Sequence, residues 1–185
     1  METYVVQCPD KDFIRVGSKY RLTGPKINIK SHFVHPLYGL QHRFDYDVQL
    51  LELFRCLSFG RTVSNIEISQ GVCGDDVIVT GWGYSEEKGD YNDILQRVKI
   101  EVVPLAACQK VKNPWYNHTL TTRMFCAGDE QGDACQGDSG GAAVSYSRLV
   151  GLSSFGYGCG RHLPGVYVNL SHPDIRIWIR QYTRI

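Results

Sequence analysis

The stretch Gln131-Gly-Asp-Ala-Cys-Gln-Gly-Asp-Ser-Gly-Gly-Ala-Ala-Val144 decides how the rest of this chain of 185 residues is interpreted. At its centre lies Gly137-Asp-Ser-Gly-Gly141. A serine hydroxyl is a weak nucleophile until its surroundings activate it. Glycines on both sides of Ser139 allow backbone conformations that other residues resist, so the serine can project from a tight turn. The same turn can point the N–H groups of Gly137 and Ser139 into one space, where a developing oxyanion would be stabilised.

Short motifs match by chance, so this pentapeptide alone is also compatible with an ordinary glycine-rich surface turn. Its neighbours favour chemistry. Cys135 offers a covalent anchor beside the turn, and Asp138 puts a negative charge next to Ser139 that needs a positive partner if it is buried. This segment closely resembles the nucleophile loop of the trypsin/chymotrypsin-like serine proteases, and the resemblance runs through nearly all of the chain.

Composition sets the broad class of the protein. A net charge of +1 and an isoelectric point near 7.6 favour neither a nucleic-acid binder nor an acidic tail. No apolar run approaches the ~20 residues of a membrane span. Seven cysteines indicate an oxidising compartment, although residues 1–8 do not form a signal peptide. We therefore expect a secreted, extracellular protein whose true N-terminus is missing from this sequence.

The resemblance implies an all-β fold of two antiparallel, six-stranded-type β-barrels, the first one incomplete, with a C-terminal helix. The chain would be a single trypsin-like protease domain truncated at its N-terminus. Residues 1–70 would form the remainder of the first barrel and the crossover, residues 71–171 the second barrel, and residues 172–185 the helix.

Periodicity supports these elements. Alternating apolar residues predict strands over 12–17, 26–30 and 95–104. His172–Tyr182 is the one convincing helix, with Ser171 as its expected cap. Its apolar stripe, which we expect to pack against the core, consists of Ile175, Trp178, Ile179 and Tyr182.

Phe44-Asp-Tyr-Asp-Val-Gln-Leu-Leu-Glu-Leu53 is the second functional segment. An aspartate at the head of a buried strand would be held near a dry interior. The resemblance implies that Asp47 orients the catalytic histidine and stabilises its imidazolium, whereas we expect Asp45 to be exposed. The alternative for Asp47 is a strand-start aspartate without a catalytic role.

The resemblance also assigns the substrate pocket. Asp133 would lie at its base and neutralise a long basic side chain, so that cleavage would follow Arg or Lys; the alternative is a solvated acidic turn. Ser154 would bond to Asp47, while Gly156 and Gly165 would keep the pocket open. The expected partners are protein or peptide substrates with Arg or Lys at the cleavage site and protease inhibitors, with no nucleic acid and no membrane.

Two disulfides follow from the resemblance, Cys108–Cys126 and Cys135–Cys159. Cys56 and Cys73 have no counterpart in the family, so either they pair with each other or one of them pairs with Cys8. The sequon Asn117-His-Thr119 predicts a glycosylated surface loop in a secreted protein. The sequon at Asn169 lies beside a predicted strand end and is the weaker candidate.

We expect no cofactor and no metal. No acidic residue lies between Phe13 and Phe44, where the family's calcium loop would need carboxylates. His32 and His35 would lie on opposite faces of a strand, which argues against joint metal ligation. Five basic residues of this region are expected to form a solvated face, with an anion-binding patch as the alternative: Lys19, Arg21, Lys26, Lys30 and Arg43.

The catalytic base is the feature that does not fit. The family places it in Ala-Ala-His-Cys, upstream of the strand matched by Phe13–Gly17, and all six histidines lie elsewhere. In the interpretation that we favour, the chain starts just after that histidine and Cys8 is an extra loop cysteine. In the other, Val5-Val-Gln-Cys8 is itself the histidine motif with Gln7 in place of the base, and glutamine cannot act as a general base near neutral pH.

The leading hypothesis is thus a serine-type endopeptidase that hydrolyses peptide bonds through an acyl-enzyme after Arg or Lys, and whose chain as given is inactive alone. The alternative is a non-catalytic protease homologue that acts as a binding or regulatory protein. A small disulfide-rich structural module is disfavoured by the spacing of at least five family segments.

Overall fold

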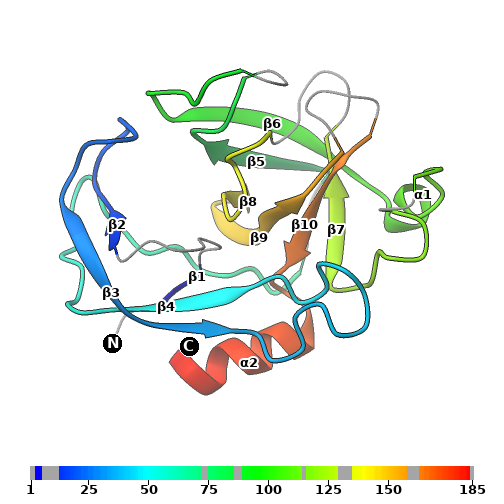
Figure 1. Ribbon diagram of the computed structural model, residues 1–185, viewed down its shortest axis with the longest axis horizontal. Coiled ribbons are helices and arrows are strands. Elements are labelled where there is room, and N and C mark those ends of the chain that lie inside the picture. Colours follow the sequence, from blue (N-terminus) through cyan, green and yellow to red (C-terminus); the bar gives the residue numbers. More distant parts are fainter. Residues whose placement is uncertain are drawn as a thin grey trace.

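The computed structural model describes residues 3–5, 13–71, 75–85, 89–113, 116–128, 135–157 and 163–183. Within these ranges the chain forms a sheet of four strands, a closed barrel of six strands and a C-terminal helix (Figure 1). The strands of the sheet are β1 Thr3–Val5, β2 Phe13–Arg15, β3 Lys26–Val34 and β4 Gln49–Leu53. Those of the barrel are β5 Asp76–Gly81, β6 Gln96–Val103, β7 Met124–Ala127, β8 Ala142–Ser145, β9 Arg148–Phe155 and β10 Gly165–Asn169. The protein is therefore all-β with one major helix, as the sequence predicts.

The four-stranded sheet is antiparallel, in the order β1-β4-β3-β2. Its longest strand, β3, alternates between exposed and buried side chains, because successive side chains of a strand point to opposite faces. Ile27 and Ile29 are buried as predicted and pack with Leu51, Leu53 and Leu57 of the same core cluster.

The barrel closes in the order β10-β7-β6-β5-β8-β9. Its core includes Val77, Val79, Ile100 and Tyr167. The β8–β9 hairpin turns through Tyr146 and Ser147, whose φ angles of 47° and 60° are typical of a two-residue type I′ turn. Closure of the barrel fixes both β8, which follows Ser139, and β9, which carries Ser154.

Helix α2, Pro173–Thr183, lies beside β3 and β4 at the bottom of the view (Figure 1). Ile175, Trp178 and Ile179 are buried as predicted, in a cluster shared with Val48 and residues of the barrel. Tyr182, the fourth residue of the predicted stripe, is 46% exposed, because it lies at the edge of this cluster with its ring against Trp178. The prediction that Ser171 caps α2 is wrong, because the helix begins at Pro173 and its N-cap position is His172. The N–H of Asp174 donates to His172 Nδ1 at 3.3 Å, and the Ser171 hydroxyl donates to Asn169 instead.

Sequence periodicity did not predict helix α1, Leu105–Cys108, a single turn that follows Pro104. Among the described residues, neither helix is both long and apolar enough to cross a membrane.

Two disulfides anchor the barrel side of the molecule. Cys108 is bonded to Cys126, which confirms the predicted pair and joins α1 to β7. Cys135 is disulfide-bonded too, whereas Cys159, its predicted partner, lies outside the described residues. Cys56 is an exposed free thiol. The possibility that it pairs with Cys73 or Cys8 is therefore wrong, and both of those residues lie outside the described ranges.

Candidate active site

Ser139 lies in the turn that leads into β8. The turn is closed by two backbone hydrogen bonds, from Asp138 N–H to the Cys135 carbonyl at 3.0 Å and from Gly141 N–H to the Asp138 carbonyl at 2.8 Å. Gly137 has a φ of 94°, in the left-handed region that favours glycine. Ser139 is exposed, and within the described part of the chain its side chain has no recorded hydrogen bond. The turn thus presents the hydroxyl to solvent.

Asp138 connects this turn to the segment Gly81-Trp-Gly83, which begins with the last residue of β5. Its Oδ1 accepts the Gly83 N–H at 2.8 Å and its Oδ2 accepts the Cys135 N–H at 3.0 Å. A Cβ atom at Gly81 or Gly83 would overlap the Asp138 carboxylate. Two glycines are therefore needed here because a carboxylate occupies the space that side chains would fill.

The backbone around Gln136 and Gly137 is fixed by its neighbours. Tyr84 N–H donates to the Gln136 carbonyl at 2.9 Å, and the ring of Tyr91 lies against the α-carbon of Gly137. In the part of the chain that the structure covers, neither Gly137 N–H nor Ser139 N–H has a recorded acceptor. Both donors are thus available to an external oxygen atom.

Asp47 lies between β3 and β4 and is only 5% exposed. The Ser154 hydroxyl, buried on β9, donates to Asp47 Oδ2 at 2.6 Å. Val48 N–H donates to the Tyr46 carbonyl at 2.7 Å, so Asp47 is the central residue of a three-residue turn. Burial, together with the negative charge of Asp47, raises the pKa of the Tyr38 hydroxyl. The carboxylate is thus held at the junction of the sheet and the barrel.

Asp45, by contrast, overturns its prediction. It is 0% exposed and forms an ion pair with Arg123 through two hydrogen bonds, of 2.9 Å from Nε to Oδ1 and 2.7 Å from Nη2 to Oδ2. Buried charges are stable only when they are paired and hydrogen-bonded. The sequence alone could not show this pair because its members are 78 residues apart.

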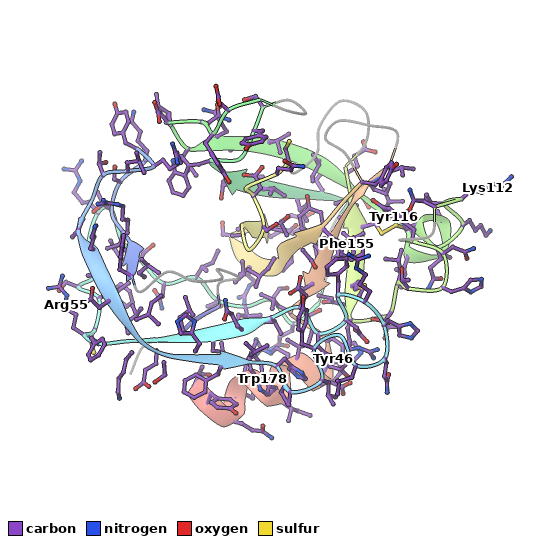
Figure 2. The ribbon with its side chains drawn as sticks, in the orientation of Figure 1. Tyr46, Arg55, Lys112, Tyr116, Phe155 and Trp178 are labelled. Carbon is purple, nitrogen blue, oxygen red and sulfur yellow. A yellow bond between two sulfur atoms is a disulfide. The ribbon has the colours of Figure 1, made fainter. Side chains whose placement is uncertain are left out.

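The remaining predicted pocket residues lie at strand ends. Gly156 follows β9, and Gly165 begins β10 opposite Ala127 of β7. Between them in sequence is a part of the chain outside the described residues, as is Asp133. Phe155 stacks on Phe44 with ring centroids 4.7 Å apart (Figure 2 labels Phe155), so an aromatic wall joins β9 to the segment that carries Asp47.

The two histidines of the His-x-x-His pattern have different surroundings. His32 is exposed, whereas His35 is 5% exposed and stacks on Tyr46 with ring centroids 4.3 Å apart. His35 Nδ1 accepts the Leu37 N–H at 3.2 Å, and burial lowers the pKa of His35. Among the described residues, no three metal-binding side chains gather at one place. His35 is thus a packed core histidine.

Each of the five basic residues near the N-terminus contacts an acidic or aromatic side chain of its own. Lys30 pairs with Glu52 at 2.8 Å and Arg21 with Asp93 at 3.8 Å. The other three lie over rings: Lys19 over Tyr20, Lys26 over Phe13 and Arg43 over Phe44. This pattern fits a solvated face better than a shared anion site.

The two sequons also differ. Asn117 is exposed in the turn 116–119. Asn169 is half-buried, and its side chain accepts the Ser171 N–H at 3.1 Å and donates to the Thr122 carbonyl at 3.4 Å. Because an engaged amide is a poor acceptor for a glycan, Asn117 stays the predicted site.

A closed β-barrel beside a second sheet, a Gly-Asp-Ser-Gly-Gly turn and a buried aspartate between β3 and β4 are together typical of the chymotrypsin-like class of serine protease folds. The sequence profile that matches this chain is that of the family described as Trypsin, over residues 6–179. The chain therefore belongs to the trypsin family.

Several curated relatives agree with this assignment. The vitellin-degrading protease of Bombyx mori is 40% identical over 179 residues, which cover 92% of this chain and 66% of that protein. Trypsin 5G1 of Aedes aegypti is 32% identical, with 91% and 64% covered, and trypsin-1 of Astacus astacus is 36% identical, with 90% and 70% covered. The chain spans about two thirds of the length of these relatives.

A solved structure supports the fold independently. Neuropsin, a serine protease expressed in the limbic system of mouse brain, superposes with a TM-score of 0.86 over 97% of this chain and 83% of that one. At 24% sequence identity, this likeness supports the fold and nothing finer.

Proposed function

We propose that the protein is a serine-type endopeptidase that hydrolyses peptide bonds through an acyl-enzyme, with Ser139 as nucleophile and Asp47 as the carboxylate that orients the base. One observation carries this proposal: the same chain has an exposed Ser139 on a glycine turn and a buried Asp47 that accepts a hydrogen bond from Ser154. Asp47 would stabilise the imidazolium that forms when the base takes the serine proton. The N–H groups of Gly137 and Ser139 would bind the oxyanion.

We further propose that cleavage follows Arg or Lys. Asp133 would supply a negative charge at the base of the pocket, and the absence of side chains at Gly156 and Gly165 would admit a long basic residue. Ala134 offers no hydroxyl beside Asp133, so the pocket would favour Arg, which brings its own two-pronged hydrogen bonding. Protein and peptide substrates, and inhibitors that present a basic residue, would then be the partners of a secreted enzyme.

The missing element is the base. No hydrogen bond joins Ser139 to any of the five histidines among the described residues, which are His32, His35, His42, His118 and His172. His35 is engaged with Leu37, and His172 caps α2. We therefore expect residues 1–185 alone to be inactive, because a serine without its base keeps only ~10³–10⁴-fold of rate over water.

The pairing of β1 favours a second candidate, the non-catalytic homologue. β1 is antiparallel to β4, with Val5 opposite Leu50, so β1 runs toward Asp47 as its residue numbers rise. Gln7 follows β1 by two residues in the sequence, and the family match begins at residue 6. These facts support the interpretation in which Val5-Val-Gln-Cys8 stands for the histidine motif. The chain would then bind basic segments without cleaving them.

One set of variants tests both candidates. Residues 1–185, Gln7→His and Gln7→His/Ser139→Ala would be compared for labelling by a fluorophosphonate and for hydrolysis of peptide 4-nitroanilides ending in Arg, Lys or Ala. We expect no labelling of the parent, labelling of Gln7→His with cleavage after Arg and Lys, and loss of both when Ser139 is replaced. Strong labelling of the parent would contradict the claim that the base is missing.

A folded but unlabelled Gln7→His variant would favour the first interpretation of the N-terminus. A version extended with an upstream segment that carries Ala-Ala-His-Cys should then be labelled. Binding of 4-aminobenzamidine, an arginine mimic, tests the pocket without needing the base. The parent should bind it, and Asp133→Ser should not.

A further inference from the structure

We propose that Arg123 is a positioning residue for Asp47, and that it acts through the buried carboxylate of Asp45. This inference rests on the proposed function, because the role of Asp47 is assigned there. Arg123 itself lies just before β7 of the closed barrel, whereas Asp45 lies between β3 and β4 of the four-stranded sheet. Their ion pair therefore joins the two halves of the molecule beside the candidate active site.

The Asp45 carboxylate is fully satisfied. Besides the two bonds from Arg123, Oδ1 accepts the Thr121 hydroxyl at 3.0 Å and the Tyr46 N–H at 3.1 Å. A guanidinium that donates two parallel bonds fixes direction as well as distance. The hydrogen bonding to Asp45 also raises the pKa of Arg123. Asp45 thus has one defined position relative to the barrel.

The backbone on both sides of Asp45 needs such a restraint. Phe44 and Tyr46 have φ angles of 62° and 55°, in the left-handed region that residues with a Cβ avoid. Strained conformations of this kind persist only when surrounding contacts hold them. Tyr46 is also the first residue of the turn that runs from its carbonyl to Val48 N–H and has Asp47 at its centre. The ion pair therefore determines where the chain enters the Asp47 turn.

The ring of Tyr46 is held from three sides. Its hydroxyl donates to Asp174 Oδ2 of α2 at 3.0 Å, His35 stacks on one face, and the Arg123 guanidinium lies 4.6 Å from the ring centroid. Figure 2 shows Tyr46 beside Trp178 at the end of the molecule that α2 covers. These contacts restrain the Tyr46 side chain from three parts of the chain.

Asp47 is thereby attached twice to the barrel that carries Ser139. One attachment is direct, from the Ser154 hydroxyl, and the other runs through Tyr46 and Asp45 to Arg123. The direct bond fixes one carboxylate oxygen, whereas the second attachment fixes the backbone of the turn. Loosening the second should therefore shift Asp47 while the barrel stays intact.

The experiment compares Arg123→Lys with a matched control. Lysine keeps the charge but cannot form the two-pronged bond. Arg148→Lys makes the same change in the exposed pair between Arg148 and Glu67, which is 2.7 Å long with side chains 51% and 72% exposed. Amide hydrogen exchange would be measured for Val48, in the turn, and for Val150, in β9. We expect Arg123→Lys to speed exchange at Val48 at least tenfold and to leave Val150 unchanged, and Arg148→Lys to change neither.

The same variants in the Gln7→His background give a second readout. We expect Arg123→Lys to lower kcat at least tenfold with KM within twofold of the parent, because the base is misaligned while the substrate pocket is not. Equal exchange at Val48 in Arg123→Lys and Arg148→Lys would overturn the proposal, as would a uniform rise that includes Val150. So would local exchange at Val48 without a loss of kcat in an active background.

The two proposals fail separately. Hydrogen exchange needs no catalysis, so it decides the role of Arg123 even where Gln7→His remains inactive. Conversely, an active Gln7→His enzyme that is indifferent to Arg123→Lys would retain the endopeptidase proposal and remove this one.

Discussion

The Ser139 turn and the Asp47 turn are built in opposite ways. Ser139 is exposed, and its turn depends on glycines, on backbone hydrogen bonds within a few residues and on the fit of the Asp138 carboxylate against Gly81 and Gly83. Asp47 is buried, and it follows two non-glycine residues in the left-handed region that contacts with distant residues restrain. A nucleophile has to reach a substrate, whereas an orienting carboxylate has to be shielded from water. The first need is met by glycines and the space that they leave for Asp138. The second is met by polar partners that bond to buried carboxylates.

This difference predicts where each turn is vulnerable. Changes that add volume should damage the Ser139 turn, because its neighbours are glycines that make room for Asp138. Changes that remove a polar partner should damage the Asp47 turn, because its carboxylates are buried and need their hydrogen bonds.

The largest effect is expected for Arg123→Met. Removing the guanidinium leaves the Asp45 carboxylate buried without a cation, which costs ~3–5 kcal/mol of unfolding free energy. Urea denaturation would measure this loss. The matched change Arg148→Met breaks an exposed pair and should cost ~0–1 kcal/mol. Similar costs for the two variants would mean that the Asp47 turn does not depend on its distant partner.

Ser154→Ala should have the next largest effect. It removes the 2.6 Å hydrogen bond to the buried Asp47 carboxylate, and a hydrogen bond to a charged group contributes ~1.5–3 kcal/mol. Thermal or urea unfolding would measure the change. Ser58→Ala, at an exposed position outside the strands and helices, provides the control and should be within ~0.5 kcal/mol of the parent.

Gly81→Ala probes the Ser139 turn. The added methyl group would overlap the Asp138 carboxylate, and such overpacking costs ~1–3 kcal/mol. Gly60→Ala is the matched control, since a Cβ there meets no atom within 4 Å. An unchanged unfolding free energy for Gly81→Ala would show that Asp138 can move without cost. The space at Gly81 would then not restrain the Ser139 turn.

The smallest effect concerns pH. Burial lowers the pKa of His35 below its ordinary value of 6.5, so between 6.5 and the folded-state pKa the unfolded chain binds more protons than the folded one. The contribution of His35 to stability is therefore complete above pH 6.5 and is lost as the pH falls below that value.

Unfolding free energies measured from pH 7.5 to pH 5 would show this decline, and it should be smaller in His35→Gln. The exposed His118→Gln should retain the full decline. A decline that is equal in all three proteins would assign the pH dependence to other groups.

The difference between local sequence patterns and contacts of distant residues explains how far the sequence could predict the structure. The alternation around Ile27 and Ile29 and the apolar stripe of α2 are local patterns. The first was confirmed, and the second was confirmed except for Tyr182, which is exposed. The disulfide Cys108–Cys126, which the family resemblance predicted, was confirmed by the structure. The prediction that Asp45 is exposed was wrong. Its burial depends on Arg123, which is 78 residues away in the sequence.

Errors at element ends have a similar cause. Ser171 is a good capping residue by type, but the helix begins one position later and a ring nitrogen of His172 accepts the free N–H. The need for glycine at positions 81 and 83, which is the space required by Asp138, became visible only in three dimensions.

The exposed thiol of Cys56 gives the two halves of the molecule separate optical reporters. Cys56 follows β4 of the four-stranded sheet, whereas Trp82 follows β5 of the barrel. A dye attached to Cys56 could accept excitation energy from tryptophan, and replacing both Trp115 and Trp178 by phenylalanine would leave Trp82 as the one tryptophan donor in the sequence. Changes in energy transfer would then reveal whether the sheet separates from the barrel before either half unfolds.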